Sequence, residues 1–174
     1  MQFETSEGNA MNSLPARFIL VMRHAEKPDD AGNPNLSQAG SARADRLATY
    51  IPENFGDPDV IIAAKNSPES ERPVQTVTPL AQRHDPPLTV QTPYTDREFV
   101  EAASLMLTGG DYKDKQLIVC CWHHENIPPL MNALKCEPGS YPDPWHGKVF
   151  NLILKVCIVG PDGPNPVEQI VEPF

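Results

Sequence analysis

The fold class follows from the run Arg17-Phe18-Ile19-Leu20-Val21-Met22-Arg23-His24. Its apolar centre, from Phe18 to Met22, is typical of a strand buried on both faces of a parallel sheet. The run is far too short to cross a membrane as a helix. The strand therefore predicts a buried sheet that delivers a polar pair, Arg23-His24, at its carboxyl end.

Strand patterns and helix patterns alternate along the rest of the chain. The expected strands cover residues 17–22, 60–64 and 116–122, and the segments 148–158 and 167–171 are expected to form a terminal strand pair. The first expected helix begins after Ser37 and ends at Pro52, and the second begins at Pro73 and runs toward Arg83. Two more helices are expected over residues 97–107 and 128–135. This order predicts an α/β domain over residues 15–174, preceded by a polar, flexible tail over residues 1–14.

Composition and charge restrict the class of partner. The formal net charge is −9, and no run of lysine and arginine provides the positive surface that nucleic acids and anionic membranes require. The four cysteines lack the spacing of metal ligands, and none is followed six residues later by the arginine that a cysteine-dependent phosphatase needs. We therefore expect a protein of the reducing cytoplasm that binds neither nucleic acid nor membrane.

Polar residues follow each of the three apolar strands. His24 follows the first strand, Arg72 lies in the segment after the second, and His123-His124 follow the third. In a parallel sheet these residues meet at one edge. Two guanidinium groups can hold phosphoryl oxygens, a neutral imidazole can attack phosphorus, and a second histidine can stabilise developing charge. A nearby carboxylic acid is needed to protonate the leaving oxygen.

The order of these motifs resembles the histidine phosphatase superfamily, whose members are phosphoglycerate-mutase-like. The likeness rests on four segments in sequence order, which are Val21-Met22-Arg23-His24-Ala25-Glu26-Lys27, Leu36-Ser37-Gln38-Ala39-Gly40-Ser41-Ala42-Arg43-Ala44, Ser67 with Arg72-Pro73-Val74-Gln75-Thr76, and Leu117-Ile118-Val119-Cys120-Cys121-Trp122-His123-His124. The resemblance implies a short member without large insertions. Its expected fold is a three-layer sandwich with a central, mostly parallel sheet flanked by helices.

The resemblance also implies a role for individual residues. His24 matches the histidine that becomes phosphorylated, and Arg23 and Arg72 match the paired phosphate-binding arginines. The second pocket histidine is His123 or His124, and we favour His124 because Trp122-His123-His124-x-x-Ile127-Pro128 resembles a variant in which the second of the pair is active. The general acid is implied to be Asp96, with Glu98 as its competitor. Lys27, Arg43 and Lys65 are interpreted as solvated surface charges.

The expected function is a metal-independent phosphatase that hydrolyses phosphate monoesters through a phosphohistidine on His24, without a cofactor. Its substrate is a phosphorylated small molecule or a phosphoprotein. The alternatives are a phosphohistidine-protein phosphatase and a non-catalytic phosphate-binding member of the same fold. A metal-assisted hydrolase built on His123-His124-Glu125 is a rival, although adjacent histidines at a strand end point in opposite directions.

Overall fold

The computed structural model describes residues 16–174, and the flexible tail predicted for residues 1–14 lies outside the described residues. The strands are β1 (Arg17–Arg23), β2 (Val60–Ala63), β3 (Leu117–Trp122), β4 (Leu152–Ile158) and β5 (Val167–Val171). The helices are α1 (Gln38–Phe55), α2 (Arg72–Arg83), α3 (Phe99–Thr108) and α4 (Ile127–Ala133), and a short 3-10 turn, η1 (His124–Asn126), precedes α4. The described residues therefore have the predicted alternation of strands and helices.

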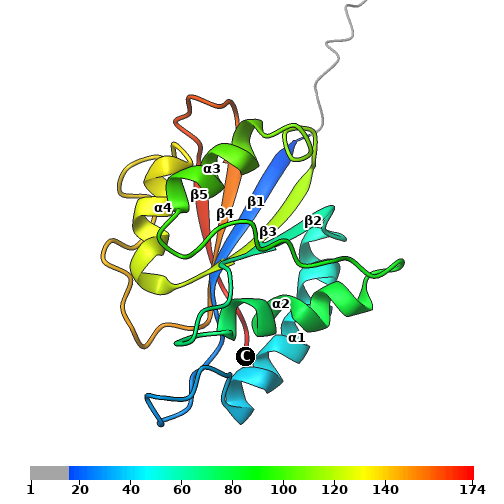
Figure 1. Ribbon diagram of the computed structural model, residues 1–174. Helices are drawn as coiled ribbons and strands as arrows, with labels where there is room; N and C mark the ends of the chain where they lie inside the picture. The colour runs from blue at the N-terminus through cyan, green and yellow to red at the C-terminus, as the bar shows by residue number, and fades with distance from the viewer. Residues whose placement is uncertain (1–15) are drawn as a thin grey trace, which may run out of the picture.

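The five strands form one mixed sheet in the order β2-β3-β1-β4-β5 (Figure 1). Strand β3 pairs in parallel with both β1 and β2, so the carboxyl ends of these three strands meet at one edge. Strands β4 and β5 run antiparallel on the other side of β1. The mostly parallel centre and the terminal strand pair predicted from the sequence are both confirmed.

Helices cover both faces of the sheet, which gives the predicted three layers (Figure 1). Helices α1 and α2 pack on one face through Leu47, Ile51, Val77 and Leu80. Helices α3 and α4 pack on the other through Ala103, Met106, Leu130 and Met131. Every side chain of β3 is buried, because this strand lies between two neighbours in the middle layer. Burial of these apolar faces supplies the main stabilisation of the fold.

The helix that follows Ser37 begins as predicted but ends later. The hydroxyl of Ser37 accepts a hydrogen bond of 3.0 Å from the Gly40 amide and so caps α1. The prediction that Pro52 ends this helix is wrong, because α1 continues to Phe55. A proline so close to the end removes only one backbone hydrogen bond. The helix ends instead at Gly56, whose φ of 93° is accessible to glycine.

Two other boundaries differ from the predictions in a way that affects the site. Strand β4 begins at Leu152, so residues 148–151, which we predicted as strand, belong to a loop. Helix α3 begins at Phe99, which leaves Arg97 and Glu98 outside the helix predicted for them. Both segments lie beside the carboxyl ends of the parallel strands, where loops carry functional groups.

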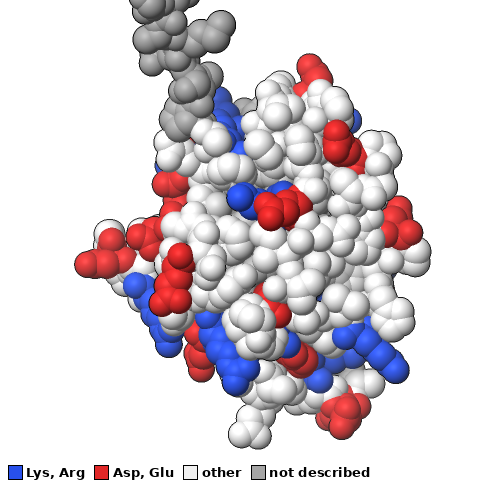
Figure 2. All heavy atoms as spheres, turned by 180° about the vertical axis from the view of Figure 1, so that it is seen from behind, with Lys and Arg blue, Asp and Glu red and all other residues white. Residues whose placement is uncertain are grey.

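The surface in Figure 2 shows lysine and arginine side chains interspersed with aspartate and glutamate around a broad uncharged area. On this face of the described residues no extended basic surface forms. Among residues 16–174, no helix has the length and apolar character needed to cross a membrane.

Candidate active site

The register of two parallel strands places the two histidine positions together. Arg23 at the end of β1 pairs with Trp122 at the end of β3, so the next residues along, His24 and His123, are neighbours on the same face of the sheet. The His24 amide donates a hydrogen bond of 3.1 Å to the Trp122 carbonyl and extends the pairing by one step. The two imidazole rings lie edge to face with their centroids 5.1 Å apart.

This geometry favours His123 over His124 as the histidine that lies beside His24. We favoured His124 from the sequence, but the structure places the ring of His123 against His24. His123 still has an extended backbone, with φ −89° and ψ 138°, and so continues the alternation of β3. His124 begins η1 and is half-buried further along the pocket wall. Strand alternation after Trp122 is the physical reason for the difference.

His24 is held as a neutral imidazole with a defined tautomer. Its side chain is buried, and Nδ1 lies 2.7 Å from the Ala25 carbonyl oxygen. A carbonyl oxygen can only accept, so Nδ1 carries the proton and Nε2 keeps its lone pair. Burial lowers the pKa of His24 to about 3, and the positive charges of Arg23 and Arg72 act in the same direction. Nε2 is therefore available as a nucleophile at neutral pH.

Two arginines approach this imidazole from different elements. Arg23 ends β1, and its guanidinium stacks on the ring of Phe150, 3.8 Å from the ring centroid, and donates 2.6 Å to the Gly147 carbonyl. Arg72 begins α2 and donates 2.8 Å to the Asn33 carbonyl. Burial lowers the pKa of Arg23 to about 10, which leaves its guanidinium charged at neutral pH.

Both arginines keep an unused donor. The buried Nε atoms of Arg23 and Arg72 have no hydrogen-bond partner in the part of the chain that the structure describes. Buried donors of this kind are costly unless they are paired. Both residues line the cavity that holds His24, and guanidinium groups match the oxygens of an anionic group such as phosphate.

The two competing carboxylates lie in different surroundings. Burial raises the pKa of Asp96, which favours its protonated form, and its Oδ2 accepts a hydrogen bond from the Asn126 side chain. Its Oδ1 is also buried, and the backbone amide of His123 interacts with the carboxyl and opposes this rise in pKa. Glu98 is exposed, and hydrogen bonds from the amide and hydroxyl of Thr95 lower the pKa of its carboxyl. Asp96 therefore holds a proton more readily than an ordinary aspartate, whereas Glu98 caps the turn at Thr95.

One cavity of about 710 Å³ brings the predicted residues together. Its lining includes Arg23, His24, Arg72, Asp96, His123 and His124, but not Glu98. Lys27 and Lys65, which we interpreted as surface charges, also line this cavity. Arg43 does not, because it is engaged with Glu26 and Glu172 at 2.8 and 2.6 Å. Ser67 caps a turn by accepting a hydrogen bond from the Ser70 amide.

Three contributors to the site were missed from the sequence. Phe150 supports Arg23, and Asn126 binds Asp96. Thr76 accepts a hydrogen bond of 2.9 Å from the Ala25 amide and donates 2.7 Å to the Arg72 carbonyl, which ties the residue after His24 to the start of α2. Only Thr76 had a signal in the sequence, since it belongs to the segment that resembles the superfamily motif.

The metal-dependent rival requires a converging set of ligands. Within residues 16–174, no group of three or more histidine, cysteine, aspartate or glutamate side chains is arranged to hold a metal ion.

Comparison with known proteins gives matches at the level of structure. No protein-family model matches the chain, and no curated protein matches it in sequence. The structure of the protein histidine phosphatase SixA complexed with tungstate superposes with a TM-score of 0.62 at 18% identity, covering 88% of this chain and 96% of SixA.

Two further structures have the same arrangement over nearly their whole lengths. The SixA protein from Nakamurella multipartitia gives a TM-score of 0.60 at 14% identity, covering 91% of this chain and 98% of that chain. A mycobacterial glucosyl-3-phosphoglycerate phosphatase gives 0.58 at 14% identity, with coverages of 90% and 98%. The described chain therefore has the fold of the histidine phosphatase superfamily, in its short form.

Proposed function

We propose that this protein is a metal-independent phosphatase that hydrolyses phosphate monoesters through a phosphohistidine on His24. The observation that carries the proposal is the fixed, neutral imidazole of His24, whose Nδ1 proton is held by the Ala25 carbonyl while Nε2 is left unprotonated. The guanidinium groups of Arg23 and Arg72, which line the same cavity as His24, support a phosphoryl site beside it.

In the first step, the Nε2 lone pair of His24 forms a bond to phosphorus as the bond from phosphorus to the leaving oxygen breaks. Arg23 and Arg72 stabilise the non-bridging oxygens, whose charge they match. We assign the second pocket histidine to His123, because its ring contacts His24. Burial lowers the pKa of His123 to about 4, so a neutral His123 supplies one N–H donor to the phosphoryl group.

Asp96 supplies the proton for the leaving oxygen. Asn126 donates a hydrogen bond to Oδ2 of Asp96, and burial raises the pKa of the carboxyl. The carboxyl therefore holds a proton more readily than an ordinary aspartate, and it donates that proton as the leaving group departs. In the second step the Asp96 carboxylate takes a proton from water, the water oxygen attacks phosphorus, and the bond from Nε2 to phosphorus breaks. Inorganic phosphate leaves and His24 is regenerated.

The substrate is a phosphorylated small molecule or a phosphoprotein. Proteins of this fold include one named as a protein histidine phosphatase and one named as a phosphatase of glucosyl-3-phosphoglycerate, so the fold accommodates both classes. We place the enzyme in the cytoplasm, since all four of its cysteines are free thiols and disulfides accumulate in oxidising compartments.

Turnover of an aryl phosphate in the presence of a chelator tests the proposal. We expect the wild-type protein to remain active with the chelator, and to be inhibited competitively by tungstate. His24→Ala should lose all activity. His84→Ala is a matched control, because His84 lies beyond the end of α2 and does not line the cavity. A protein that is inactive, or that stops with the chelator, or a His24→Ala protein that is active, contradicts the proposal.

A further inference from the structure

The buried face of helix α2 carries one polar side chain among apolar ones. The buried residues of this helix are Pro73, Thr76, Val77, Leu80 and Ala81, and Thr76 is 0% exposed. A buried hydroxyl costs free energy unless it is hydrogen-bonded, so packing alone would favour an apolar side chain of the same shape, such as valine. The hydroxyl of Thr76 therefore points to a role beyond packing.

Both hydrogen bonds of this hydroxyl lead to residues of the proposed active site. The hydroxyl donates 2.7 Å to the carbonyl of Arg72, one helical turn earlier, and accepts 2.9 Å from the amide of Ala25. That amide belongs to the peptide group that joins His24 to Ala25. The carbonyl of Ala25 in turn accepts the 2.7 Å hydrogen bond from Nδ1 of His24. One buried hydroxyl thus connects the backbone of a phosphate-binding arginine to the backbone that orients the nucleophile.

No other hydrogen bond replaces this connection. Among residues 16–174, the bond from Ala25 to Thr76 is the only one that joins residues 23–25 to α2. The guanidinium of Arg72 is placed separately, by its 2.8 Å bond to the carbonyl of Asn33. The position of α2 relative to the end of β1 therefore depends on apolar packing and on this one hydroxyl.

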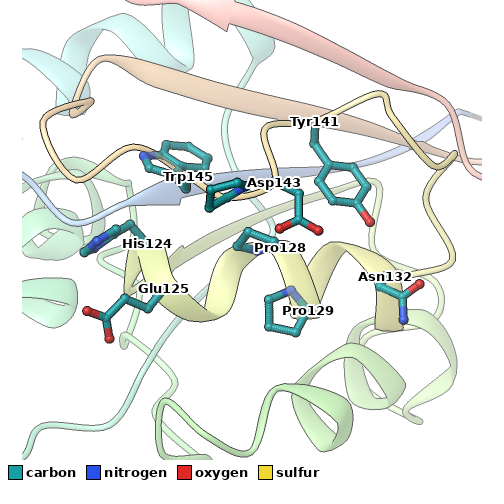
Figure 3. A pocket seen from close by; sticks show the side chains of 9 residues that line it. His124, Glu125, Pro128, Pro129, Asn132, Tyr141, Asp143 and Trp145 are labelled. Carbon is teal, nitrogen blue, oxygen red and sulfur yellow. The ribbon is translucent and has the colours of Figure 1, made fainter.

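Arg23 is held from a different part of the molecule. It directly precedes the nucleophile in the chain, and its guanidinium donates 2.6 Å to the carbonyl of Gly147. Gly147 belongs to the loop that follows Trp145, and Figure 3 shows Trp145 beside His124 at a neighbouring cavity that both residues line. Of the two arginines, only the one on α2 therefore depends on the Thr76 hydroxyl for its place relative to the nucleophile.

We propose that Thr76 is a positioning residue, whose hydroxyl holds the imidazole of His24 in its Nδ1-protonated tautomer and in line with the phosphoryl group bound by Arg72. The inference rests on the proposed function, because it assumes that Nε2 of His24 attacks phosphorus. Without the hydroxyl, the buried amide of Ala25 loses its acceptor, so the chain at Ala25 shifts and carries with it the carbonyl that fixes the ring. A displacement of about 1 Å at a reacting atom can lower a rate by about 10².

Steady-state kinetics of three variants test this role. Thr76→Val keeps the shape of the side chain and removes the hydroxyl, and we expect kcat for a nitrophenyl phosphate to fall about 10- to 100-fold. KM should change by less than about threefold, because the guanidinium groups that bind the substrate remain. Thr76→Ser retains the hydroxyl and should bring kcat to within about threefold of the wild type. Thr78→Val is the matched control, since Thr78 on the same helix donates 2.7 Å to the carbonyl of Val74 and lies outside the cavity, and it should keep the wild-type kcat.

The tautomer of His24, measured by proton–nitrogen NMR of the free protein at neutral pH, provides a readout that a general loss of stability would not change. The wild type and Thr76→Ser should show Nδ1 protonated and Nε2 unprotonated, and Thr76→Val should show a mixture, because the tautomer is set by the hydrogen bond at the other nitrogen. Thr76→Ala removes the hydroxyl in a second way and should show the same mixture, which keeps the test decisive if the valine variant does not fold.

Four results would overturn the inference. They are a wild-type kcat in Thr76→Val, an equal loss in Thr78→Val, a failure of Thr76→Ser to restore kcat, and a single Nδ1-protonated tautomer in the variants that lack the hydroxyl. An inactive wild-type protein would instead contradict the proposed function, and the comparison of tautomers would still decide whether the hydroxyl orients His24.

Discussion

The Asp96→Asn substitution separates the proton donor from the rest of the site. Asparagine has the size of aspartate, but it cannot transfer the proton that we place on the Asp96 carboxyl. The backbone carbonyl of Asp96, which accepts 2.9 Å from the Trp122 indole, is untouched, so the loop should keep its position. The expected effect is therefore on catalysis and not on folding.

The size of the effect depends on the leaving group. General acid catalysis contributes about 10² to 10⁴ in rate, which corresponds to about 2.7 to 5.4 kcal/mol. An alkyl phosphate should lose most of this contribution, because an alkoxide is a poor leaving group without a proton. A nitrophenyl phosphate should lose about tenfold or less, because its phenolate leaves readily without one. A plot of log kcat against leaving-group pKa should be steeper for Asp96→Asn than for the wild type.

The pH profile provides a second readout. Burial raises the pKa of Asp96, and the reaction requires the protonated form, so kcat/KM for an alkyl phosphate should fall as pH rises through that pKa. Asp96→Asn should lack this alkaline fall. Glu98→Gln is the control, since Glu98 is exposed and outside the cavity, and it should keep both the rate and the profile. An Asp96→Asn protein with wild-type turnover of alkyl phosphates would refute the assignment of the acid.

Three further predictions follow from other parts of the structure. His123→Ala should lower kcat for an aryl phosphate by about 10² or more, and His124→Ala by less than about tenfold, because the ring of His123 packs edge to face against His24; equal losses in steady-state assays would contradict this. Gly40→Ala should cost about 1 to 3 kcal/mol in urea unfolding, since its Cβ would lie 2.3 Å from the Glu26 carbonyl oxygen; an unchanged midpoint would argue against that contact. Burial raises the pKa of Glu172 to about 7 from its ordinary 4.5, so its contribution to stability is complete below about pH 4.5 and is lost as pH rises through 7. The melting temperature of the wild type should be lower at pH 8 than at pH 5, and this difference should be smaller in Glu172→Gln. An equal difference in the two proteins would contradict the prediction.

The central strands could be predicted because their signal is local. The buried run that ends at Arg23-His24 and the run that ends at Trp122 consist of consecutive apolar residues, as expected of strands in a sheet that is covered on both faces. The ends of these strands therefore identified His24, and the parallel order brought the second histidine pair to the same edge. The observed pairing of β1 with β3 agrees with that expectation.

Which of His123 and His124 lies against His24 could not be predicted from the sequence, because it depends on register. Pairing of Arg23 with Trp122 makes His24 and His123 neighbours, and a shift by one residue would have placed His124 there instead. The support given by Phe150 and Asn126 was hidden for a similar reason. Phe150 reaches Arg23 from a loop that follows a long connection, and Asn126 binds Asp96 across 30 residues of chain. Contacts between distant loops leave no periodic pattern in the sequence.

The most direct test of the mechanism is the identity of the phosphorylated atom. The wild-type protein is mixed with an aryl phosphate, quenched at high pH within milliseconds, and examined by mass spectrometry of its peptides and by phosphorus NMR. We predict an acid-labile, base-stable phosphoryl group on Nε2 of His24, because Nδ1 is occupied by its hydrogen bond to Ala25. A phosphoryl group on another residue or on Nδ1, or substrate turnover with no phosphoenzyme while His24→Ala stays active, would contradict the account.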